Sequence, residues 1–221
     1  MKTDETGEIL FIDKPKGITS FDVIRRLRRM TGKKKFGHAG TLDPLASGLL
    51  IVGVGAATKK LQGFLKLPKV YEAEILLGRR TDTGDVAGKT IDELRIKNYE
   101  LREEEIQKIL KGMVGKLELP VPMYSAVKRG GEALYKKARR GEQFTPPVKP
   151  MEVRAAEFLG VRREGEEVIL KLRFDVGSGT YIRSLAEELG RRLFVPATLA
   201  NLRRISIGNF SVADAKKLDR N

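Results

Sequence analysis

Asp43 is the residue whose surroundings most favour catalysis. It lies in the segment Gly37-His38-Ala39-Gly40-Thr41-Leu42-Asp43-Pro44, a loop punctuated by glycines. Pro44 disfavours helical geometry at the residue before it. An aspartate held in such a loop could serve as a nucleophile or as a base. The alternative is a turn that Asp43-Pro44 merely initiates, and the residue types alone favour that simpler interpretation.

A second candidate is the segment Gly177-Ser178-Gly179-Thr180-Tyr181-Ile182-Arg183, which joins an expected strand to an expected helix. Its glycines let the backbone approach a ligand closely, and the start of a helix favours an anion. Arg183 could pair with a phosphate or with a carboxylate such as Asp43. An ordinary strand-to-helix turn with a surface arginine explains the same residues equally well.

The residue inventory argues against most other chemistry. The sequence has one histidine, His38, and no cysteine, which excludes disulfides, zinc–thiolate sites and cysteine nucleophiles. No serine stands in a G-x-S-x-G turn, and neither the G-x-x-x-x-G-K-[ST] phosphate loop nor the G-x-G-x-x-G fingerprint occurs. We therefore expect neither a metal ion nor an organic cofactor.

Strands and helices alternate irregularly around these loops, which indicates an α+β fold with a largely antiparallel sheet. Hydrophobic periodicity predicts strands at 9–12, 49–54, 70–77, 153–159, 168–176 and 205–210, and helices at 20–32, 58–65, 103–114 and 181–193. Ser20 is expected to cap the first helix. Residues 14–17 and 79–88 are expected to be turns or loops.

The charge balance favours a polyanionic partner. With 43 basic and 29 acidic residues the net charge is +14, and nucleic acid is the commonest polyanion. The alternatives are a solvated basic surface and the high charge content of a thermophile. No run of roughly 18 apolar residues is present, and the acidic N-terminus lacks the features of a signal peptide. We expect a cytoplasmic protein with no membrane segment.

Residues 119–150 differ in character from the rest. Five prolines bracket the strongly basic stretch KRGGEALYKKARRG. This composition predicts an insertion with stiff ends and a cationic tip.

Six sequence blocks, in order, resemble the bacterial TruB-type tRNA pseudouridine synthases. They cover nearly the whole chain, and together they are far more specific than any one of them. The blocks are DKPKGITSFDVI (13–24), GHAGTLDPLASGLL (37–50), KVYEAEILLGRRTDTGDVAG (69–88), PVPMYSAVKRGGEALYKKARRG (120–141), VGSGTYIRSLAEELG (176–190) and LANLRRISIGNF (199–210).

The resemblance implies a pseudouridine synthase fold, with a mixed, mainly antiparallel sheet flanked by helices and an active-site cleft across it. Residues 1–221 would form one catalytic domain, and a segment at about 121–150 would be a thumb that clamps RNA. The implied activity is isomerisation of the uridine at position 55 in the T-loop of tRNA, with no metal or cofactor. The partner would be the tRNA T-loop and T-stem, and a monomer is expected.

The resemblance also assigns catalytic roles. Asp43 would be the essential carboxylate, by attack on the ribose, attack on the base or a glycal route. Arg183 would pair with Asp43 and keep it ionised, and Asp85 would hold Arg183 in place. Tyr71 would stack on the flipped uracil and could take the C5 proton.

Other positions would bind the substrate. His38 would fill the space left by the flipped base, Tyr181 and Leu202 would line the pocket, and Lys14 and Pro15 would support the cleft. Phosphate contacts in the thumb would come from its cations. These are Lys136, Lys137, Arg139 and Arg140.

Two alternatives to catalysis alone stay open. One is a chaperone that remodels tRNA, which is compatible with catalysis because flipping a base opens the loop. The other is a non-catalytic structural RNA-binding protein. The family usually carries a C-terminal RNA-binding module beyond the last block, whereas this sequence ends at Asn221. We expect the chemistry to survive without that module and the affinity for RNA to depend on it.

Overall fold

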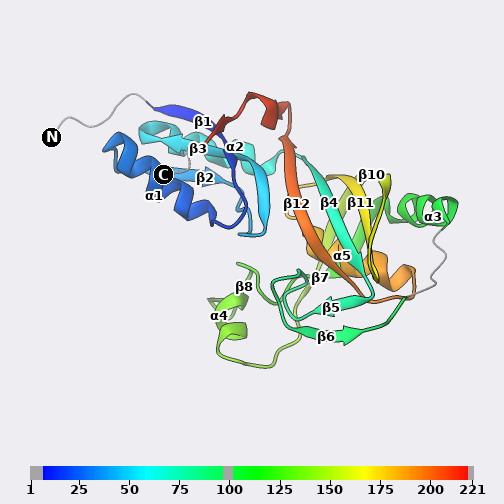
Figure 1. The fold of residues 1–221 in the computed structure, drawn as a ribbon. Helices are drawn as coiled ribbons and strands as arrows, with labels where there is room; N and C mark the ends of the chain where they lie inside the picture. Colours follow the sequence, from blue (N-terminus) through cyan, green and yellow to red (C-terminus); the bar gives the residue numbers. More distant parts are fainter. Residues whose placement is uncertain (1–6, 97–101, 219–221) are drawn as a thin grey trace. The chain divides into compact units, whose positions relative to one another are not determined.

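The computed structural model describes residues 7–96 and 102–218. The chain divides into two compact units. The first unit contains Met1–Glu72 and Asn201–Asn221, and the second contains Ala73–Ala200. Strands β4 (Lys69–Leu77) and β12 (Ala197–Ile207) contribute residues to both units and lie side by side in the sheet (Figure 1). That residues 1–221 form one catalytic domain stays a prediction.

The first unit is built around β3, a strand of small and aliphatic residues. Its other strands are β1 (Glu8–Lys14), β2 (Phe36–Ala39) and the short β13 (Phe210–Ser211) and β14 (Lys216–Lys217). β3 (Ala46–Val54) pairs antiparallel with β1 from Gly48 to Val54 and with β2 at its C-terminal end. Its N-terminal end pairs in parallel with β12. β3 therefore pairs with three other strands.

Alternation along β3 places helices on both faces of this sheet. Leu50 and Val52 form one apolar cluster with Val23 and Leu27 of α1 (Ser20–Thr31). Leu49 and Ile51 form a second cluster with Leu61 of α2 (Leu61–Lys66), which follows the 3₁₀ helix η1 (Gly55–Lys60). Burying one such leucine contributes about 1.5–3 kcal/mol, so both faces stabilise the strand that begins beside Asp43.

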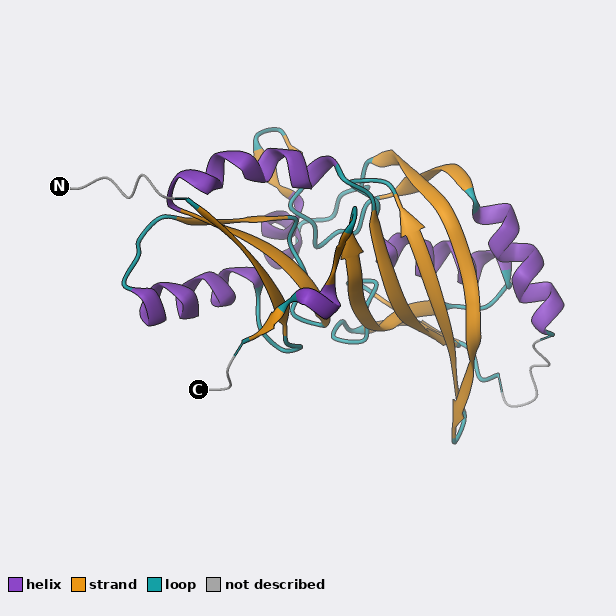
Figure 2. Ribbon diagram, turned by 90° about the horizontal axis from the view of Figure 1, so that it is seen from above, coloured by secondary structure: helices purple, strands orange, loops and turns teal. Residues whose placement is uncertain are grey.

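The second unit continues with strands in the order β12-β4-β11-β10-β7. Its long elements are the antiparallel hairpin of β10 (Val148–Glu164) and β11 (Glu167–Val176), the strand β7 (Gly115–Pro120), and the helices α3 (Glu103–Met113) and α5 (Ile182–Arg192). Helix α3 packs against β10 and also contacts α5 (Figure 2). A separate two-stranded ribbon joins β5 (Arg79–Thr81) to β6 (Thr90–Glu93).

The basic insertion folds into β8 (Lys128–Arg129), β9 (Glu132–Ala133) and α4 (Leu134–Arg139). Its base is closed by a hydrogen bond from the Val121 N–H to the Pro147 carbonyl, 3.0 Å long. The last residues of the predicted insertion belong to β10, which begins at Val148.

The α+β architecture with a mixed, mainly antiparallel sheet is confirmed, and several local predictions were wrong. The last long strand is Ala197–Ile207 rather than 205–210, because the fold satisfies polar residues that had argued against a strand. Part of the expected loop at 79–88 is β5. The cap of α1 is Thr19, which forms a capping box with Asp22. Over the described ranges, no helix is both long and apolar enough to cross a membrane.

Candidate active site

The loop that carries Asp43 (residues 40–45) connects β2 to β3 and is fixed by backbone hydrogen bonds. Gly40 adopts a left-handed φ of 84°, which turns the chain out of β2. The Ala46 N–H donates to the Asp43 carbonyl at 3.0 Å, and the Gly17 N–H donates to the Pro44 carbonyl at 2.7 Å. The Asp43 side chain is left half-buried. The loop is therefore tied to the start of β3 and to the turn before α1.

Ser20 adds a second tie between the Asp43 loop and α1. The Leu42 N–H donates to the Ser20 hydroxyl at 2.9 Å, and that hydroxyl donates to the Leu42 carbonyl at 3.1 Å. The sequence predicted that Ser20 would cap the helix, but Thr19 does so. This leaves the Ser20 hydroxyl for the residue next to Asp43.

Lys14 and Pro15 lie in the segment that supports this loop. Lys14 ends β1 rather than opening a turn, and its side chain is fully buried. Its ammonium donates to the carbonyls of Pro15 at 3.0 Å and Ile18 at 2.6 Å. Burial lowers the pKa of Lys14 from 10.5 to about 8, and the negative charge of Asp43 acts in the opposite direction. Lys14 thus holds the turn together and supplies positive charge to the surroundings of Asp43.

Tyr71 is a buried residue of β4, and Arg204 of β12 lies beside it. The Arg204 Nη1 atom is 3.5 Å from the Tyr71 hydroxyl oxygen. The same guanidinium donates from Nη2 to the Gly40 carbonyl at 3.1 Å. Tyr71 is therefore connected, through one side chain, to the first residue of the Asp43 loop.

His38 and Leu202 belong to the first unit as well. His38 lies in β2 opposite Val52 of β3, half-buried. Burial, followed by the charge of Arg204, lowers the pKa of His38 below its usual 6.5, so the imidazole is neutral at pH 7. Leu202 is buried on β12 opposite Ala46, the first residue of β3. Both side chains thus come from strands that border the Asp43 loop.

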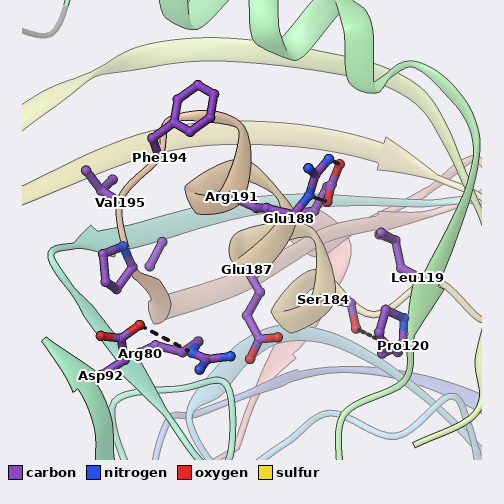
Figure 3. A pocket seen from close by; sticks show the side chains of 12 residues that line it. Arg80, Asp92, Leu119, Pro120, Ser184, Glu187, Glu188, Arg191, Phe194 and Val195 are labelled. Atoms are coloured by element: carbon purple, nitrogen blue, oxygen red, sulfur yellow. Dashed lines mark hydrogen bonds and ion pairs between the residues drawn. The ribbon is translucent and has the colours of Figure 1, made fainter.

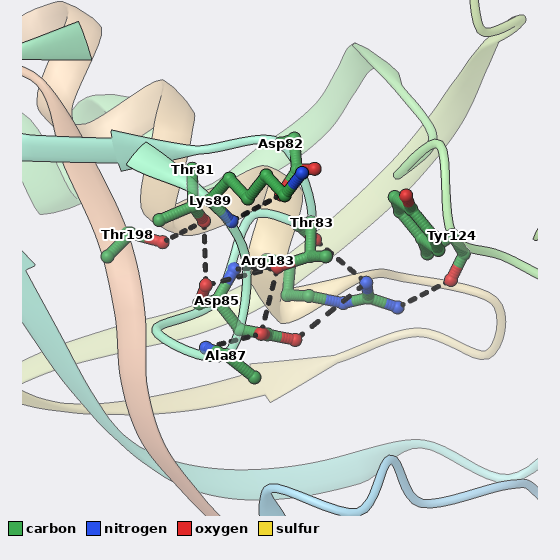
Figure 4. Close-up of polar contacts among 9 residues, drawn as sticks. All are labelled: Thr81, Asp82, Thr83, Asp85, Ala87, Lys89, Tyr124, Arg183 and Thr198. Atoms are coloured by element: carbon green, nitrogen blue, oxygen red, sulfur yellow. Dashed lines mark hydrogen bonds and ion pairs between the residues drawn. The ribbon is translucent and has the colours of Figure 1, made fainter. Parts of the chain in front are cut away.

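In the second unit, Arg183 is a buried cation in the first turn of α5. Its Nη1 donates to the Thr83 carbonyl at 2.9 Å and its Nη2 to the Tyr124 carbonyl at 3.1 Å (Figure 4). The Asp85 carboxylate is 4.0 Å from Nη1, at the outer limit of an ion pair. Arg183 therefore joins α5 to two loops that lie far apart in the sequence.

Asp85 organises the loop that receives Arg183. Its carboxylate accepts a hydrogen bond from the Thr83 hydroxyl at 2.9 Å and from the Ala87 N–H at 3.1 Å. The Thr81 hydroxyl donates to its backbone carbonyl at 2.6 Å. Asp85 thus holds the loop in the shape that presents the Thr83 carbonyl to Arg183. Direct attraction to the guanidinium adds to this indirect effect.

Tyr181 precedes α5 and is half-buried. Its N–H points to the sulfur of Met151 at 3.5 Å. The residue therefore stands on a segment attached to β10 at one side and to α5 at the other.

The four predicted thumb cations gather on and after α4 but differ in their surroundings. Arg140 makes a bidentate pair with Glu132, at 2.6 and 2.7 Å, and also pairs with Glu142. Arg139 lies over the ring of Tyr135, 5.4 Å from its centre. The side chain of Lys136 is exposed, and that of Lys137 is half-buried. The charge of Arg140 is thus largely offset by carboxylates.

The second unit also contains a cavity of about 460 Å³ beside α5. Ser184 and Glu187 of α5 line it, together with Arg80, Asp92 and the exposed Phe194 (Figure 3). No residue predicted to catalyse or to bind RNA is among its lining residues. Residues 7–96 and 102–218 hold no group of three or more histidine, aspartate and glutamate side chains suited to a metal ion.

Sequence reasoning missed two buried cations near these residues, Arg204 and Lys69. The ammonium of Lys69 donates to the carbonyls of Leu65 and Leu67, at 2.7 and 2.6 Å, and burial lowers its pKa to about 8. A signal for Arg204 did exist: strand periodicity in LRRISI places it on the same face as Leu202. Nothing local indicated that this face is buried.

Comparison with known proteins identifies related sequences. The profile described as TruB family pseudouridylate synthase (N terminal domain) matches residues 28–182. A protein of Xanthomonas euvesicatoria named tRNA pseudouridine synthase B is 44% identical over 202 residues, which are 91% of this chain and 64% of that protein. One of Endomicrobium trichonymphae with the same name is 42% identical over 94% of this chain and 87% of that protein. The chain spans about two thirds of the length of the first of these relatives.

Solved structures show the same fold. A chain in a Cbf5-Nop10-Gar1 complex is 28% identical and matches 95% of this chain and 52% of that one, with a TM-score of 0.69. A chain in the archaeal box H/ACA sRNP Nop10-Cbf5 complex is 27% identical and matches 95% of this chain and 50% of that one, with a TM-score of 0.65.

Proposed function

Because this chain belongs to the TruB family of pseudouridylate synthases, we propose that it converts a uridine of tRNA to pseudouridine. The names of its relatives support tRNA as the substrate. The reaction breaks the bond between N1 of uracil and C1′ of ribose and rejoins the base through C5, so no atom is gained or lost overall. We further propose that the target is the uridine at position 55 of the T-loop.

The observation that carries the proposal is the way the Asp43 loop is held. Three segments hydrogen-bond to it: the turn before α1, the start of α1, and Arg204 of β12. Fixing in advance the backbone that carries a reactive carboxylate reduces the cost of orienting it during the reaction. We propose that Asp43 is the catalytic carboxylate and that it acts in the ionised form.

An ionised carboxylate at Asp43 needs a positive charge to stabilise it. We propose that Arg183 pairs with Asp43 in the active site, since an opposite charge favours the ionised form. Its fixed hydrogen bonds to Thr83 and Tyr124 support this role, because they orient the guanidinium in advance. Asp85 would act on Asp43 only indirectly, by shaping the loop that contains Thr83.

A uridine within a stacked loop must be flipped out before it can react. We propose that His38, neutral and half-buried, fills the space that the base leaves. Tyr71 would stack on the flipped uracil and take part in removing the C5 proton. Tyr181 and Leu202 would form the walls of the pocket.

Affinity for tRNA would come from the thumb and from the net charge of +14. Lys136, Lys137, Arg139 and Arg140 would contact phosphates, which provide affinity without sequence information. Selection of the T-loop would follow from its shape and from the flipped base. We propose a monomer, since this chain supplies every residue proposed here. We also propose that it acts in the cytoplasm.

The test is to incubate the protein with an unmodified tRNA transcript, without cofactor, and to map pseudouridine. The wild type should modify position 55, and Asp43→Asn should modify no position, because the amide cannot act as an anion. Asp214→Asn, which changes an exposed aspartate of a 3₁₀ helix, serves as the control and should remain active. Pseudouridine formed by Asp43→Asn would refute the assignment of Asp43.

A role as a tRNA-folding chaperone is a second candidate. The cationic thumb favours the chaperone role, because contacts between the thumb and the tRNA could open the T-loop without the catalytic residues. Asp43→Asn should still accelerate the refolding of a misfolded tRNA if this role exists. A wild type that binds tRNA and forms no pseudouridine would instead indicate a structural RNA-binding protein.

A further inference from the structure

Among the residues that the structure describes, Arg204 has the largest fully buried side chain, with 1% of its surface exposed. It lies on β12 within the first unit, opposite Gly48 of β3. A buried guanidinium is costly unless every direction in which it donates is matched by an acceptor. Its surroundings therefore indicate what the residue is for.

The backbone around Arg204 is packed so tightly that only glycine fits opposite it. Gly48 has a φ of 104°, and a Cβ atom there would lie 2.2 Å from the carbonyl oxygen of Arg204. This close approach fixes the position of Arg204 relative to β3. The side chain thus extends from a rigid point.

Three acceptors surround the guanidinium, and each belongs to a different segment. Nε donates to the Leu49 carbonyl at 2.7 Å, within β3. Nη2 donates to the carbonyl of Gly40, which opens the Asp43 loop, at 3.1 Å. Nη1 is 3.5 Å from the Tyr71 hydroxyl oxygen, on β4. Two of the three segments carry residues proposed to react with the substrate.

The shape of the guanidinium explains why arginine occupies this position. Its donors form a rigid planar fork, so three acceptors bonded to one arginine are fixed relative to one another. An ammonium on a flexible stem has no such geometry. The positive charge is also a cost: burial lowers the pKa values of the nearby Lys14, His38 and Lys69, and the charge of Arg204 lowers them further.

We propose that Arg204 is a positioning residue for pseudouridine formation. It holds the Tyr71 hydroxyl and the Gly40 end of the Asp43 loop in a fixed mutual arrangement, so that the tyrosine and the aspartate address the same nucleotide. It acts on the substrate only through Tyr71 and the Asp43 loop. This inference rests on the proposed function.

The kinetic test compares Arg204→Lys with Arg203→Lys, both assayed below their melting temperatures. Arg203 is the neighbour on the same strand, and it pairs with Asp13 at 2.8 Å. Arg204→Lys should lower kcat by about 100-fold, while KM for tRNA changes by less than about threefold, because phosphate contacts are untouched. Arg203→Lys should leave both constants within about threefold of wild type. A folded Arg204→Lys protein with nearly normal kcat would overturn the proposal.

A double-mutant cycle shows whether Arg204 acts through Tyr71. Tyr71→Phe removes the hydroxyl that faces the guanidinium. If Arg204 positions that hydroxyl, the combined variant should lose less activity than the product of the two single losses. Fully multiplicative losses would overturn the proposal.

A spectroscopic measurement tests the same contact without reference to activity. Protein labelled with 3-fluorotyrosine gives one ¹⁹F resonance for each of its five tyrosines, and Tyr71→Phe identifies that of Tyr71. Arg204→Lys should shift this resonance, and Arg203→Lys should not. An unchanged resonance overturns the positioning role. Wild-type protein that forms no pseudouridine refutes the proposed function instead, whatever the spectrum shows.

Discussion

Arg183 and Arg204 are buried arginines in different units, and they solve the same problem in different ways. Each donates to two backbone carbonyls at 2.7–3.1 Å and joins segments distant in sequence. Arg183 starts a helix and has the Asp85 carboxylate 4.0 Å away. Arg204 lies within a strand, and the third group that faces its guanidinium is the hydroxyl of Tyr71. The side chains near Arg204 include another cation, Lys69.

The difference shows what a buried guanidinium contributes in each unit. Near Arg183 a carboxylate compensates part of the charge, so the residue combines an electrostatic role with a structural one. The main contribution of Arg204 is to fix its three acceptors relative to one another. Its charge makes it less favourable for the nearby side chains to be protonated. Removing a buried charged partner commonly costs about 3–5 kcal/mol, so both residues are expected to be sensitive to substitution.

The largest expected effect separates charge from geometry at Arg183. If Arg183 pairs with Asp43 as proposed, Arg183→Met should lower kcat by about 10²–10³-fold, because the preorganised charge that keeps the carboxylate ionised is lost. Its affinity for tRNA should stay within about threefold of wild type. Single-turnover kinetics and binding assays on the same tRNA measure both. Arg191→Met, at an exposed position of the same helix, is the control. Equal losses of kcat and affinity would mean that Arg183 only grips a phosphate.

Glycines beside the two arginines sharpen the comparison of rigidity. Gly48→Ala places a Cβ atom 2.2 Å from the backbone of Arg204, whereas Gly84→Ala places one 3.3 Å from the side chain of Arg183. We expect a loss of about 3 kcal/mol for Gly48→Ala, from overlap and backbone strain. Gly84→Ala should lose about 1–2 kcal/mol, because its φ of 75° is also left-handed.

Urea unfolding measures both losses. Gly63→Ala is the control, since no heavy atom lies within 4 Å of the added Cβ in this helical position, and it should be neutral or slightly stabilising. A Gly84→Ala protein that is less stable than Gly48→Ala would contradict the tighter packing assigned to Arg204.

Because buried cations lie around Arg204, we predict that the free energy of unfolding depends on pH. Lys14 has a pKa of about 8 in the folded protein and 10.5 as its usual value, so the unfolded chain binds its proton more tightly. The stability that Lys14 contributes to the folded protein is therefore fully present above pH 10.5, and it is lost as the pH falls through 8. Between pH 7 and 9, wild type should gain about 1.4 kcal/mol relative to Lys14→Met.

Urea unfolding of both proteins at pH 7 and pH 9 gives this difference directly. Lys69 behaves in the same way in both proteins, so its contribution cancels. The quantity to follow is the free energy of unfolding of wild type minus that of Lys14→Met. If this difference stays constant or falls as the pH rises, the charge of Lys14 does not destabilise the folded protein.

The smallest effect extends the comparison to exposed cations of the thumb. Lys136→Gln should reduce the dependence of tRNA binding on salt by about one unit of slope in a plot of log K against log salt. Arg140→Gln should reduce it less, because Glu132 and Glu142 already offset the charge of Arg140. Binding titrations at several salt concentrations measure the slopes. Equal reductions would mean that RNA displaces the two glutamates.

Much of the fold followed from local patterns in the sequence. Apolar runs located β1, β3 and the hairpin of β10 and β11, and periodicity located α1, α3 and α5. Errors occurred where polar residues stand inside strands: Lys14 and His38 were assigned to turns or loops, and β12 was predicted too short. In each case the fold provides partners for a polar group that the local sequence does not reveal.

The sequence by itself determined the order of helices and strands, and its six ordered blocks determined the family and the candidate residues Asp43, Tyr71 and Arg183. Only the tertiary structure decided which polar groups meet. The partners of Arg204 lie between 133 and 164 positions away in the chain, and sheet register brings them together. Propensity and periodicity act over a few residues, whereas the burial of a charge depends on everything packed around it.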